Sequence, residues 1–310
     1  MNKTFIIGVD SGGSKIRIKI LFPHLSKVIT KTVTSFHLNA VGLRFFSEFL
    51  LTLLSSLLRK NKLKWNQCKG LCIAVAGGSN VRVRNEIKNN FRKRIKLNNI
   101  IVISDAEATL FAAFRENDGA VLICGTGSII YSKFGNKIYR VGGWGRIIGD
   151  NGSGFEIGKT VLQNLTTEYD LYNGIAKSNY LIEVERKFKI NSENFIEKIY
   201  QRNFNIAKIA KLVINLADNG NKNCKDLLRW EADKLIQQLK IFVKSKNIPK
   251  KMNLMLSGGL LENDNYYSKL VKEQIKKKFK DKFTLIEKKL LPVEGAVNLA
   301  LKEFFNKNIN

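Results

Sequence analysis

The sequence predicts an α/β protein made of two copies of one βββαβαβα unit, with a helical insertion in the second copy. The chain has 310 residues, about twice the usual length of a single domain. Its composition, 44% hydrophobic and 25% charged, is typical of a globular protein and excludes disorder, collagen and coiled coil. The same order of apolar strands, glycine turns and helices begins near residue 4 and again near residue 120.

The first half opens with three predicted strands. Residues 4–9 form a β-rich apolar run that ends in Asp10 and a Gly/Ser turn, and residues 16–20 alternate with period two. This pattern indicates a β-hairpin with a glycine tip. Pro23 breaks the chain, and residues 27–35 alternate again as a third strand.

Helices and short buried strands complete this half. Helical spacing of apolar residues and compact apolar runs distinguish the two kinds of element. We expect helices over residues 43–58, 81–94 and 106–114, and buried strands over residues 71–76 and 100–104.

The second half repeats the order. We expect strands over residues 120–124, 129–134, 138–141, 254–256 and 283–286, a long helical stretch from 154 to 243, and a closing helix over 293–305. The predicted domains are residues 1–116 and 117–310, and the closing helix at 293–310 is a candidate for packing back on the first domain. Because no low-complexity linker separates the halves, we expect them to meet directly across a central cleft.

Charge and cysteine content limit the possible partners. Lys and Arg total 53 against 26 Asp and Glu, a net charge of +27, which makes a nucleic acid worth considering. The basic stretches lack the interleaved aromatic residues of a single-strand platform, so we interpret them as solvated helix faces and expect no nucleic-acid partner. Four cysteines without metal-like spacing, no targeting segment and no membrane span predict a cytoplasmic protein.

Three glycine turns recur at the ends of predicted strands, at residues 11–14, 125–128 and 257–259. A hairpin tip rich in Gly and Ser can bring several backbone N–H groups close to one anion. A single tip of this kind is more often part of an ordinary hairpin, which also needs glycine at its turn. Two tips at the same point of both halves, with a third turn where a base or ribose could lie against bare backbone, favour a nucleotide site.

On these residues the chain resembles the actin-like, ribonuclease-H-fold sugar kinases, specifically the N-acetylglucosamine kinase group of the BadF/BadG/BcrA/BcrD ATPase family. The matching segments cover nearly the whole chain in order: residues 8–15 (GVDSGGSK), 104–106 (SDA), 124–128 (CGTGS), 142–145 (GGWG), 149–154 (GDNGSG), 257–259 (SGG) and 292–296 (PVEGA). The block from 142 to 154, which contains a tryptophan, discriminates best. The resemblance implies two actin-like (ribonuclease H-like) domains around a cleft.

The resemblance also implies ATP and Mg²⁺ as ligands. Asp10 would hold Mg²⁺ through water, the two hairpins would cradle the phosphates, and the third glycine turn would lie against the adenosine. The residues implied to bind ATP are Asp10, Gly12, Gly13, Ser14, Lys15, Gly125, Thr126, Gly127, Ser128, Gly258 and Gly259. The chain departs from the family pattern at Ser11 and Ser14, which replace a Gly and a Thr.

Asp105 is the candidate catalytic base. It follows a buried strand and begins a helix, and phosphoryl transfer to an alcohol needs a group that accepts the hydroxyl proton. The residues alone leave an alternative open, because an Asp before Ala106 and Glu107 is also a good helix N-cap. The resemblance favours the base.

Sugar contacts are implied at the same edge of the sheets. They are Asn39, Gly77, Gly78, Asp105, Gly143, Trp144 and Asp150. Trp144, with glycine on both sides, fits a pocket wall better than a core, whereas Asp150 also lies in a composition that forms tight turns for local reasons. Similar proteins often carry Glu where this chain has Asn151, so no sugar or metal contact rests on a second carboxylate there.

The function expected from these residues is an ATP-dependent kinase that phosphorylates the C6 hydroxyl of an aminosugar, first N-acetylglucosamine. Glucosamine and N-acetylmuramic acid are alternative substrates, and the resemblance suggests a homodimer. An alternative of another class is the activator ATPase of a radical 2-hydroxyacyl-CoA dehydratase. That class needs cysteines for an iron–sulfur cluster and a different second phosphate motif, and the sequence shows neither.

Overall fold

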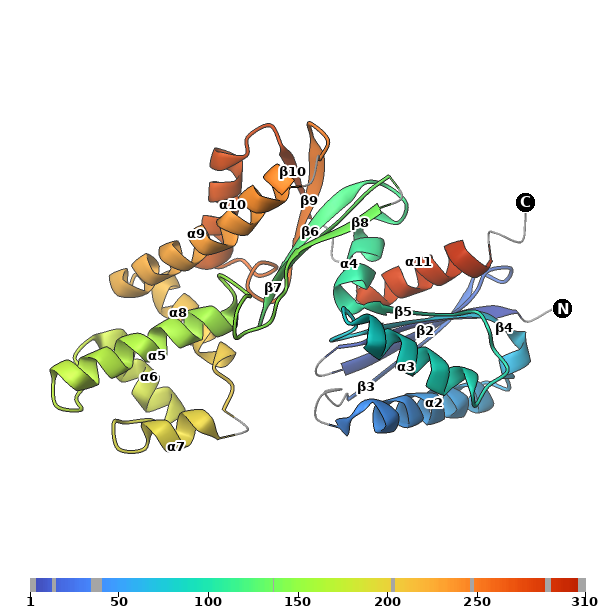
Figure 1. Ribbon diagram of the computed structural model, residues 1–310, viewed down its shortest axis with the longest axis horizontal. Helices are drawn as coiled ribbons and strands as arrows, with labels where there is room; N and C mark the ends of the chain where they lie inside the picture. The colour runs from blue at the N-terminus through green and yellow to red at the C-terminus, as the bar shows by residue number, and fades with distance from the viewer. Residues whose placement is uncertain are drawn as a thin grey trace. The chain divides into compact units, whose positions relative to one another are not determined.

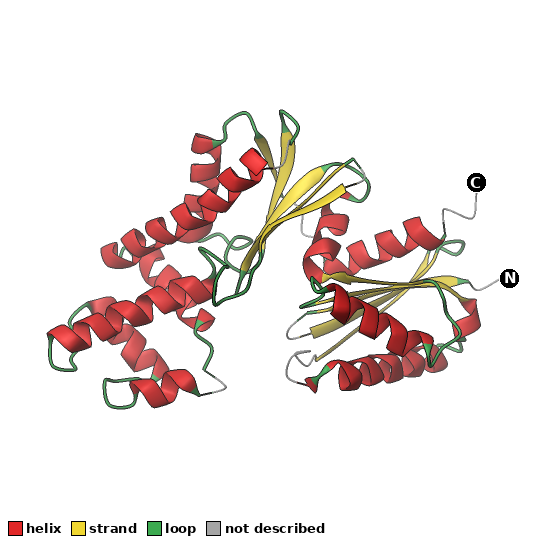
Figure 2. Ribbon diagram, in the orientation of Figure 1, coloured by secondary structure: helices red, strands yellow, loops and turns green. Residues whose placement is uncertain are grey.

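The computed structural model describes residues 4–12, 15–34, 41–135, 137–201, 204–245, 248–287 and 291–305. The chain divides into two compact units: unit 1 contains Met1–Asn117 and Lys288–Asn310, and unit 2 contains Asp118–Glu287. Each unit has its own five-stranded sheet (Figures 1 and 2). Within the described ranges no helix is long and apolar enough to cross a membrane.

The sheet of unit 1 has the strand order β3-β2-β1-β4-β5. Its strands are β1 (Phe5–Ser11), β2 (Lys15–Phe22), β3 (Lys27–Thr34), β4 (Cys68–Val75) and β5 (Ile100–Ser104). The first three strands pair antiparallel, whereas β4 and β5 run parallel to β1. The carboxyl ends of β1, β4 and β5 therefore lie at one edge, which the β1–β2 turn shares.

Helices cover both faces of this sheet (Figure 2). They are α2 (Leu43–Lys60), α3 (Val81–Arg92), α4 (Asp105–Phe114) and α11 (Pro292–Phe304), and a short 3₁₀ helix, η1 (Trp65–Gln67), precedes β4. Because side chains alternate along a strand, Ile7 and Val9 of β1 pack on the α2/α3 side and Ile6 packs on the α4/α11 side. Every residue of β1 is buried, which explains its continuous apolar sequence.

The closing helix α11 packs in unit 1, against β1 and α4. Two glycines permit the close approach. A Cβ on Gly8 would lie 2.5 Å from Cγ2 of Val297, and a Cβ on Gly295 would overlap the backbone of Ala108. The end of the chain therefore completes the first unit, although residues 118–287 intervene in the sequence.

The sheet of unit 2 has the order β10-β9-β6-β7-β8, which corresponds strand for strand to that of unit 1. Its strands are β6 (Gly119–Cys124), β7 (Ser128–Phe134), β8 (Lys137–Gly142), β9 (Met252–Ser257) and β10 (Phe283–Ile286). The first three again pair antiparallel, and β9 and β10 again run parallel to the central strand. The predicted α/β fold with one architecture used twice is confirmed.

The helices of unit 2 form its larger part. They are α5 (Gly154–Leu171), α6 (Asn179–Phe188), α7 (Phe195–Tyr200), α8 (Ala207–Asp218), α9 (Lys222–Ser245) and α10 (Tyr266–Lys278). Helices α5 to α9 occupy the chain between β8 and β9, as the predicted helical insertion requires. Ala120 and Leu122 of β6 share one apolar core with α5, α8, α9 and α10.

Candidate active site

The edge of the unit 1 sheet carries the predicted chemical groups of this half. Asp10 is the penultimate residue of β1, the Gly77-Gly78 turn follows β4, and Asp105 follows β5 directly. The Ala76 N–H donates to the Ser11 carbonyl at 3.0 Å and so joins the carboxyl ends of β1 and β4. Ligands of open α/β sheets bind beyond the carboxyl ends of parallel strands, and these residues lie there.

Asp10 is a buried carboxylate with one cationic partner. Only 2% of the residue is exposed, and its Oδ2 accepts a hydrogen bond from Arg17 Nη1 at 3.1 Å. Arg17 lies directly opposite Asp10 in the β1–β2 register, so the hairpin itself places the pair. Burial raises the pKa of the Asp10 carboxyl, and the Arg17 hydrogen bond and charge oppose that rise.

The Asp10 site fits the Mg²⁺ that the resemblance implies. Mg²⁺ usually keeps several waters and takes one or two carboxylates together with phosphate oxygens. The described residues contain no group of three or more His, Cys, Asp or Glu side chains that could enclose a metal ion. A lone buried carboxylate beside a glycine hairpin suits an ion that arrives with a nucleotide.

Asp105 is the first residue of α4, and Ser104 is the N-cap. The Ser104 Oγ accepts from the Glu107 N–H at 3.1 Å, while a Glu107 carboxylate oxygen accepts from the Ser104 N–H at 2.9 Å, which completes a capping box. The N-cap interpretation of Asp105 is therefore wrong, because the neighbouring serine performs that role. The Asp105 Oδ1 accepts a hydrogen bond from the adjacent Ala106 N–H at 2.9 Å.

The environment of Asp105 suits a general base. Burial is the main factor that raises the pKa of the Asp105 carboxyl to about 6; the Ala106 N–H opposes this rise, and the negative charges of Asp10 and Glu107 add to it. A base is most effective when its pKa lies near the operating pH. Asp105 can therefore take a proton near neutrality, unlike an ordinary surface aspartate.

At the matching edge of unit 2, residues 125–127 form the turn between β6 and β7. The carbonyls of Gly125 and Thr126 accept from the N–H groups of Gly154 and Phe155 at 2.8 and 3.1 Å, so they are used inside the unit by the start of α5. The backbone N–H groups of Thr126 and Gly127 have no hydrogen-bond partner in the described part of the chain. They are available to an anion.

The third glycine turn lies beside this hairpin. The Leu260 N–H donates to the Cys124 carbonyl at 3.2 Å, and Gly258, at φ +93°, packs so tightly on Cys124 that a Cβ would overlap it. Gly259 has no atom within 4 Å of an added Cβ, which leaves open backbone. The chain continues from this turn to α10, which begins at Tyr266.

Asp150 lies against the same hairpin. A Cβ on Gly127 would come within 2.6 Å of Asp150 Oδ2, so Gly127 must be glycine for Asp150 to stand where it does. Burial raises the pKa of the Asp150 carboxyl, and hydrogen bonds from the backbone of Ser128 and Gly145 oppose that rise. Asp150 itself has φ +59°, a strained value for a residue with a side chain.

Trp144 is 69% exposed and is not a core residue. The Arg140 guanidinium carbon lies 4.6 Å from the centroid of its ring. Gly143 has φ +68°, and a Cβ there would overlap Ile129. Ile147 and Ile148 are 87% and 80% exposed, so this loop presents an apolar surface to its surroundings.

Two side chains hold this loop in place, and no motif in the sequence points to either of them. Gln238 of α9 donates from Nε2 to Ser128 Oγ at 2.9 Å and to the Asn151 carbonyl at 3.1 Å. The Tyr267 hydroxyl, from α10, donates to the Gly152 carbonyl at 2.6 Å. Glu262 likewise accepts from the Gly258 N–H at 2.9 Å and holds the third glycine turn.

Some predicted site residues can be placed only in part. Gly13, Ser14 and Asn39 lie outside the described residues. Lys15 begins β2 and is exposed. Gly77 has φ +85°, and a Cβ on Gly78 would lie 2.6 Å from the Ile103 carbonyl, so both glycines are required by the backbone.

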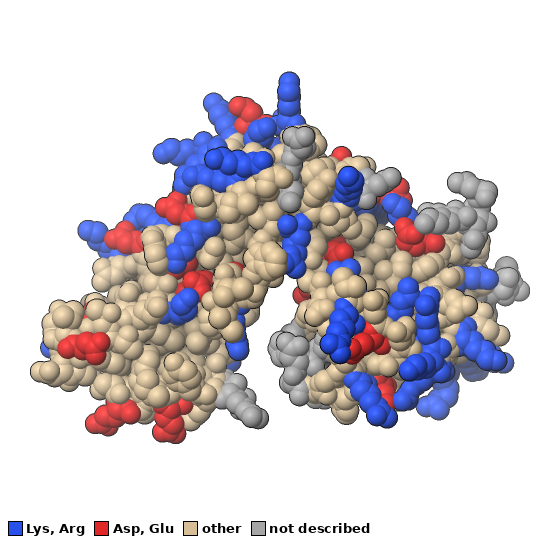
Figure 3. Space-filling model, in the orientation of Figure 1, with Lys and Arg blue, Asp and Glu red and all other residues tan. Residues whose placement is uncertain are grey.

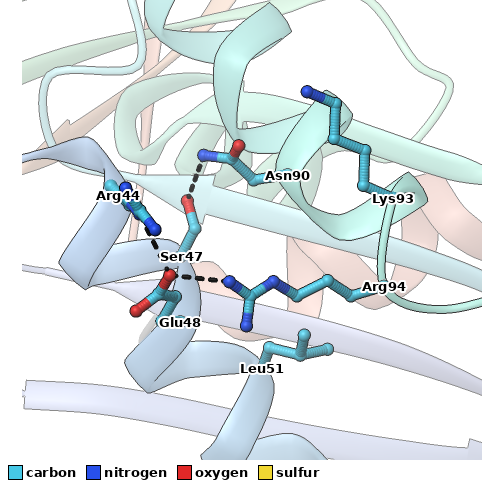
Figure 4. Close-up of a pocket in the computed structure, with 7 residues that line it drawn as sticks. All are labelled: Arg44, Ser47, Glu48, Leu51, Asn90, Lys93 and Arg94. Atoms are coloured by element: carbon cyan, nitrogen blue, oxygen red, sulfur yellow. Dashed lines mark hydrogen bonds and ion pairs between the residues drawn. The ribbon is translucent and has the colours of Figure 1, made fainter.

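A surface pocket of about 320 Å³ elsewhere in unit 1 contains none of these residues. Figure 4 shows Glu48 of α2 between two arginines: its Oε1 accepts from Arg44 Nε at 3.3 Å and from Arg94 Nη2 at 2.7 Å. Lys93 also lines this pocket. Figure 3 shows further Lys and Arg side chains over α9 and α10 of unit 2, consistent with the net charge of +27.

The duplicated strand order, with a glycine turn at the matching edge of each sheet, defines the class as an actin-like α/β ATPase. Residues 7–300 match the BadF/BadG/BcrA/BcrD ATPase family, and the chain belongs to that family. It is 28% identical over 267 residues to an N-acetylmuramic acid/N-acetylglucosamine kinase from Clostridium acetobutylicum, covering 84% of this chain and 87% of the relative.

Two further relatives match over nearly their full length. An N-acetyl-D-glucosamine kinase from Dictyostelium discoideum is 23% identical, with 97% of this chain and 99% of the relative covered. The crystal structure of a candidate N-acetylglucosamine kinase from Chromobacterium violaceum superposes with a TM-score of 0.74 at 18% identity, covering 97% of this chain and 100% of that one. This last likeness shows the shared fold.

Proposed function

We propose that the protein is an ATP-dependent kinase that transfers a phosphoryl group to the C6 hydroxyl of an aminosugar, with N-acetylglucosamine as the first candidate. The observation that carries the proposal is Asp105, a partly desolvated carboxylate with a raised pKa at the sheet edge that also holds Asp10. The curated relatives, both named as kinases of N-acetylated aminosugars, support the same substrate class.

In this proposal glycine turns of the protein supply the backbone groups that bind ATP. The free N–H groups of Thr126 and Gly127 would bind phosphate oxygens, and Gly258 and Gly259 would lie against the adenosine. Gly12, Gly13, Ser14 and Lys15 would complete the phosphate site in unit 1. Asp10 would hold Mg²⁺ through water, and the bound ion would neutralise charge on the transferring phosphate.

Asp105 would accept the proton of the sugar hydroxyl as the phosphorus–oxygen bond forms. Phosphoryl transfer otherwise depends on alignment, so the remaining groups hold the sugar. We assign this task to Asn39, Gly77, Gly78, Gly143, Trp144 and Asp150. N-Acetylmuramic acid is a second candidate substrate, favoured by the name of the Clostridium relative, and glucosamine is a third.

The activator ATPase alternative has little support. Both curated relatives are named as kinases of N-acetylated aminosugars, and neither is named as an activator ATPase. Homodimer formation, a cytoplasmic location and the absence of a nucleic-acid partner remain predictions. Light scattering of the purified protein tests the first, and binding to RNA at low and high salt tests the last.

The deciding experiment measures ATP consumption and product mass against a panel of N-acetylglucosamine, N-acetylmuramic acid, N-acetylmannosamine and glucosamine. We expect a product heavier by one phosphate at C6 for at least one N-acetylated sugar, and a kcat that falls as pH drops through about 6, because protonated Asp105 cannot accept a proton. Absence of turnover with the whole panel, by a protein that binds ATP, would refute the proposal.

A further inference from the structure

Arg84, on the first turn of α3, joins three parts of unit 1 that surround the candidate base. Its Nε donates to the Gly78 carbonyl in the turn after β4. Its two terminal nitrogens, Nη1 and Nη2, donate to the two oxygens of the Glu107 carboxylate on α4, at 3.2 and 2.5 Å. One guanidinium therefore connects α3, the end of β4 and the start of α4.

Glu107 carries this connection to the residue beside Asp105. It is 8% exposed, and the oxygen that pairs with Nη2 also accepts from the N–H and the hydroxyl of Ser104, each at 2.9 Å. Gly78 packs against the carbonyl of Ile103, which precedes Ser104. Two contacts thus hold the turn after β4 against the β5–α4 junction: the hydrogen bonds of Arg84 and the packing of Gly78 on Ile103.

We propose that Arg84 is a positioning residue for phosphoryl transfer, which clamps the Gly77-Gly78 turn to the start of α4 and so fixes the place of the Asp105 carboxylate. The inference rests on the proposed function, because it assigns Arg84 to the same reaction. A planar guanidinium can serve a carbonyl and both oxygens of a carboxylate at once, whereas a lysine ammonium is a point charge without this fork.

The pair also controls the charge near Asp105. Two charged carboxylates act on Asp105. Asp10 forms an ion pair with Arg17, and Glu107 forms an ion pair with Arg84. Without Arg84 the Glu107 carboxylate would act on Asp105 uncompensated and would raise its pKa further. Without the Glu107 charge the pKa of Asp105 would fall. The two changes therefore move the acid limb of the kcat profile in opposite directions.

The test compares Arg84→Met, Arg84→Lys and Glu107→Gln with Arg82→Met as the matched control. Arg82 forms an exposed pair with Glu86 on the same helix and contacts none of the site. For each variant kcat, the KM values for ATP and sugar, the pH profile of kcat and the melting temperature are measured. Phosphorylation of a sugar by the wild type tests the proposed function itself.

We expect Arg84→Met to lower kcat at least tenfold while the KM for ATP changes less than twofold, and to move the acid limb to higher pH. Arg84→Lys should bring the acid limb back toward the wild-type position but leave kcat reduced, because the fork is lost. Glu107→Gln should move the limb to lower pH, and it keeps the inference testable if Arg84→Met does not fold.

A different set of results would overturn the inference. If Arg84→Met melts at a lower temperature but its folded fraction keeps the wild-type kcat and pH profile, Arg84 is only a structural residue. Equal kcat in Arg84→Met and Arg82→Met leads to the same conclusion. A wild type that phosphorylates no sugar refutes the proposed function instead, so the two failures are distinguishable.

Discussion

The two sheet edges share one scaffold but differ in chemistry. Both have the same strand order, and in both the first two strands, β1 with β2 and β6 with β7, pair antiparallel. In unit 1 the strand ends supply two carboxylates with raised pKa values, Asp10 and Asp105. In unit 2 they supply bare glycine backbone. The duplicated fold thus carries buried carboxylates at the strand ends of unit 1 and glycine turns with open backbone at the strand ends of unit 2.

The side chains that hold the two edges in place also differ in charge. In unit 1 they are ion pairs, Arg17 with Asp10 and Arg84 with Glu107. In unit 2 the loop before α5 is held by the neutral side chains of Gln238 and Tyr267. We therefore expect pH to act on proton transfer in unit 1 through Asp105, and on the unit 2 edge through Asp150, whose carboxyl pKa is also raised by burial.

The largest effect should come from Asp105→Asn. Asparagine keeps the shape and can still accept the Ala106 N–H, but it cannot take a proton, so kcat should fall roughly 10²-fold or more. ATP affinity, measured by calorimetry, should stay within a factor of about two. The exposed Asp170 of α5 provides the control substitution Asp170→Asn. Wild-type turnover by Asp105→Asn would remove this residue from the mechanism.

Next in size is Gly127→Ala, which tests whether the unit 2 hairpin binds phosphate. The added Cβ collides with Asp150, so the single variant disturbs two features at once. We therefore compare it with Asp150→Ala and with the double variant. The collision displaces the Thr126 and Gly127 N–H groups, and losing hydrogen bonds worth about 1.5–3 kcal/mol to a charged phosphate predicts an ATP Kd raised about tenfold or more in Gly127→Ala. In the double variant the added Cβ has room and the N–H groups stay in place, so its ATP Kd should be close to that of Asp150→Ala.

If Gly127→Ala binds ATP as tightly as the wild type does, the hairpin is not a phosphate site. In that case the hairpin of unit 2 would have no role in nucleotide binding, and the two sheet edges would not be distinguished by their ligands.

A smaller effect is expected from Asp150→Ala alone. A carboxylate that accepts hydroxyl hydrogen bonds from the sugar contributes about 1–3 kcal/mol, so the sugar KM should rise roughly tenfold or more. The ATP Kd should change little. The sugar KM measured at saturating ATP and the ATP KM measured at saturating sugar separate the effect on sugar binding from the effect on ATP binding. Equal losses for both ligands would show that Asp150 serves only to support the hairpin.

Local sequence placed Asp10 at the end of the first strand and Asp105 directly after β5, because each lies where an apolar run stops. The helix cap was assigned to the wrong residue, Asp105, although a serine three residues before Glu107 is the signature of a capping box. Gln238 and Tyr267 could not be found, because they lie 87 and 115 residues from the carbonyls they hold. Arg84 likewise gains its meaning only when packing brings Gly78 and Glu107 to it.

The smallest expected effect concerns stability and tests the raised pKa of Asp105 without any assay of activity. In the folded protein this pKa is about 6, above its ordinary value of about 4, so ionisation of Asp105 destabilises the fold. The penalty is absent below the ordinary value, grows as pH rises through this window and is complete above pH 6. Asn carries no such penalty. Asp105→Asn should therefore melt a few degrees above the wild type at pH 7.5, corresponding to roughly 1–3 kcal/mol, and nearly with it at pH 4.5. Thermal melts at both pH values, with Asp170→Asn as the control, measure this difference. A difference between Asp105→Asn and the wild type that is the same at both pH values would mean that the Asp105 carboxylate is not destabilised by its surroundings, and the contrast between the two sheet edges would then rest on the placement of their residues alone.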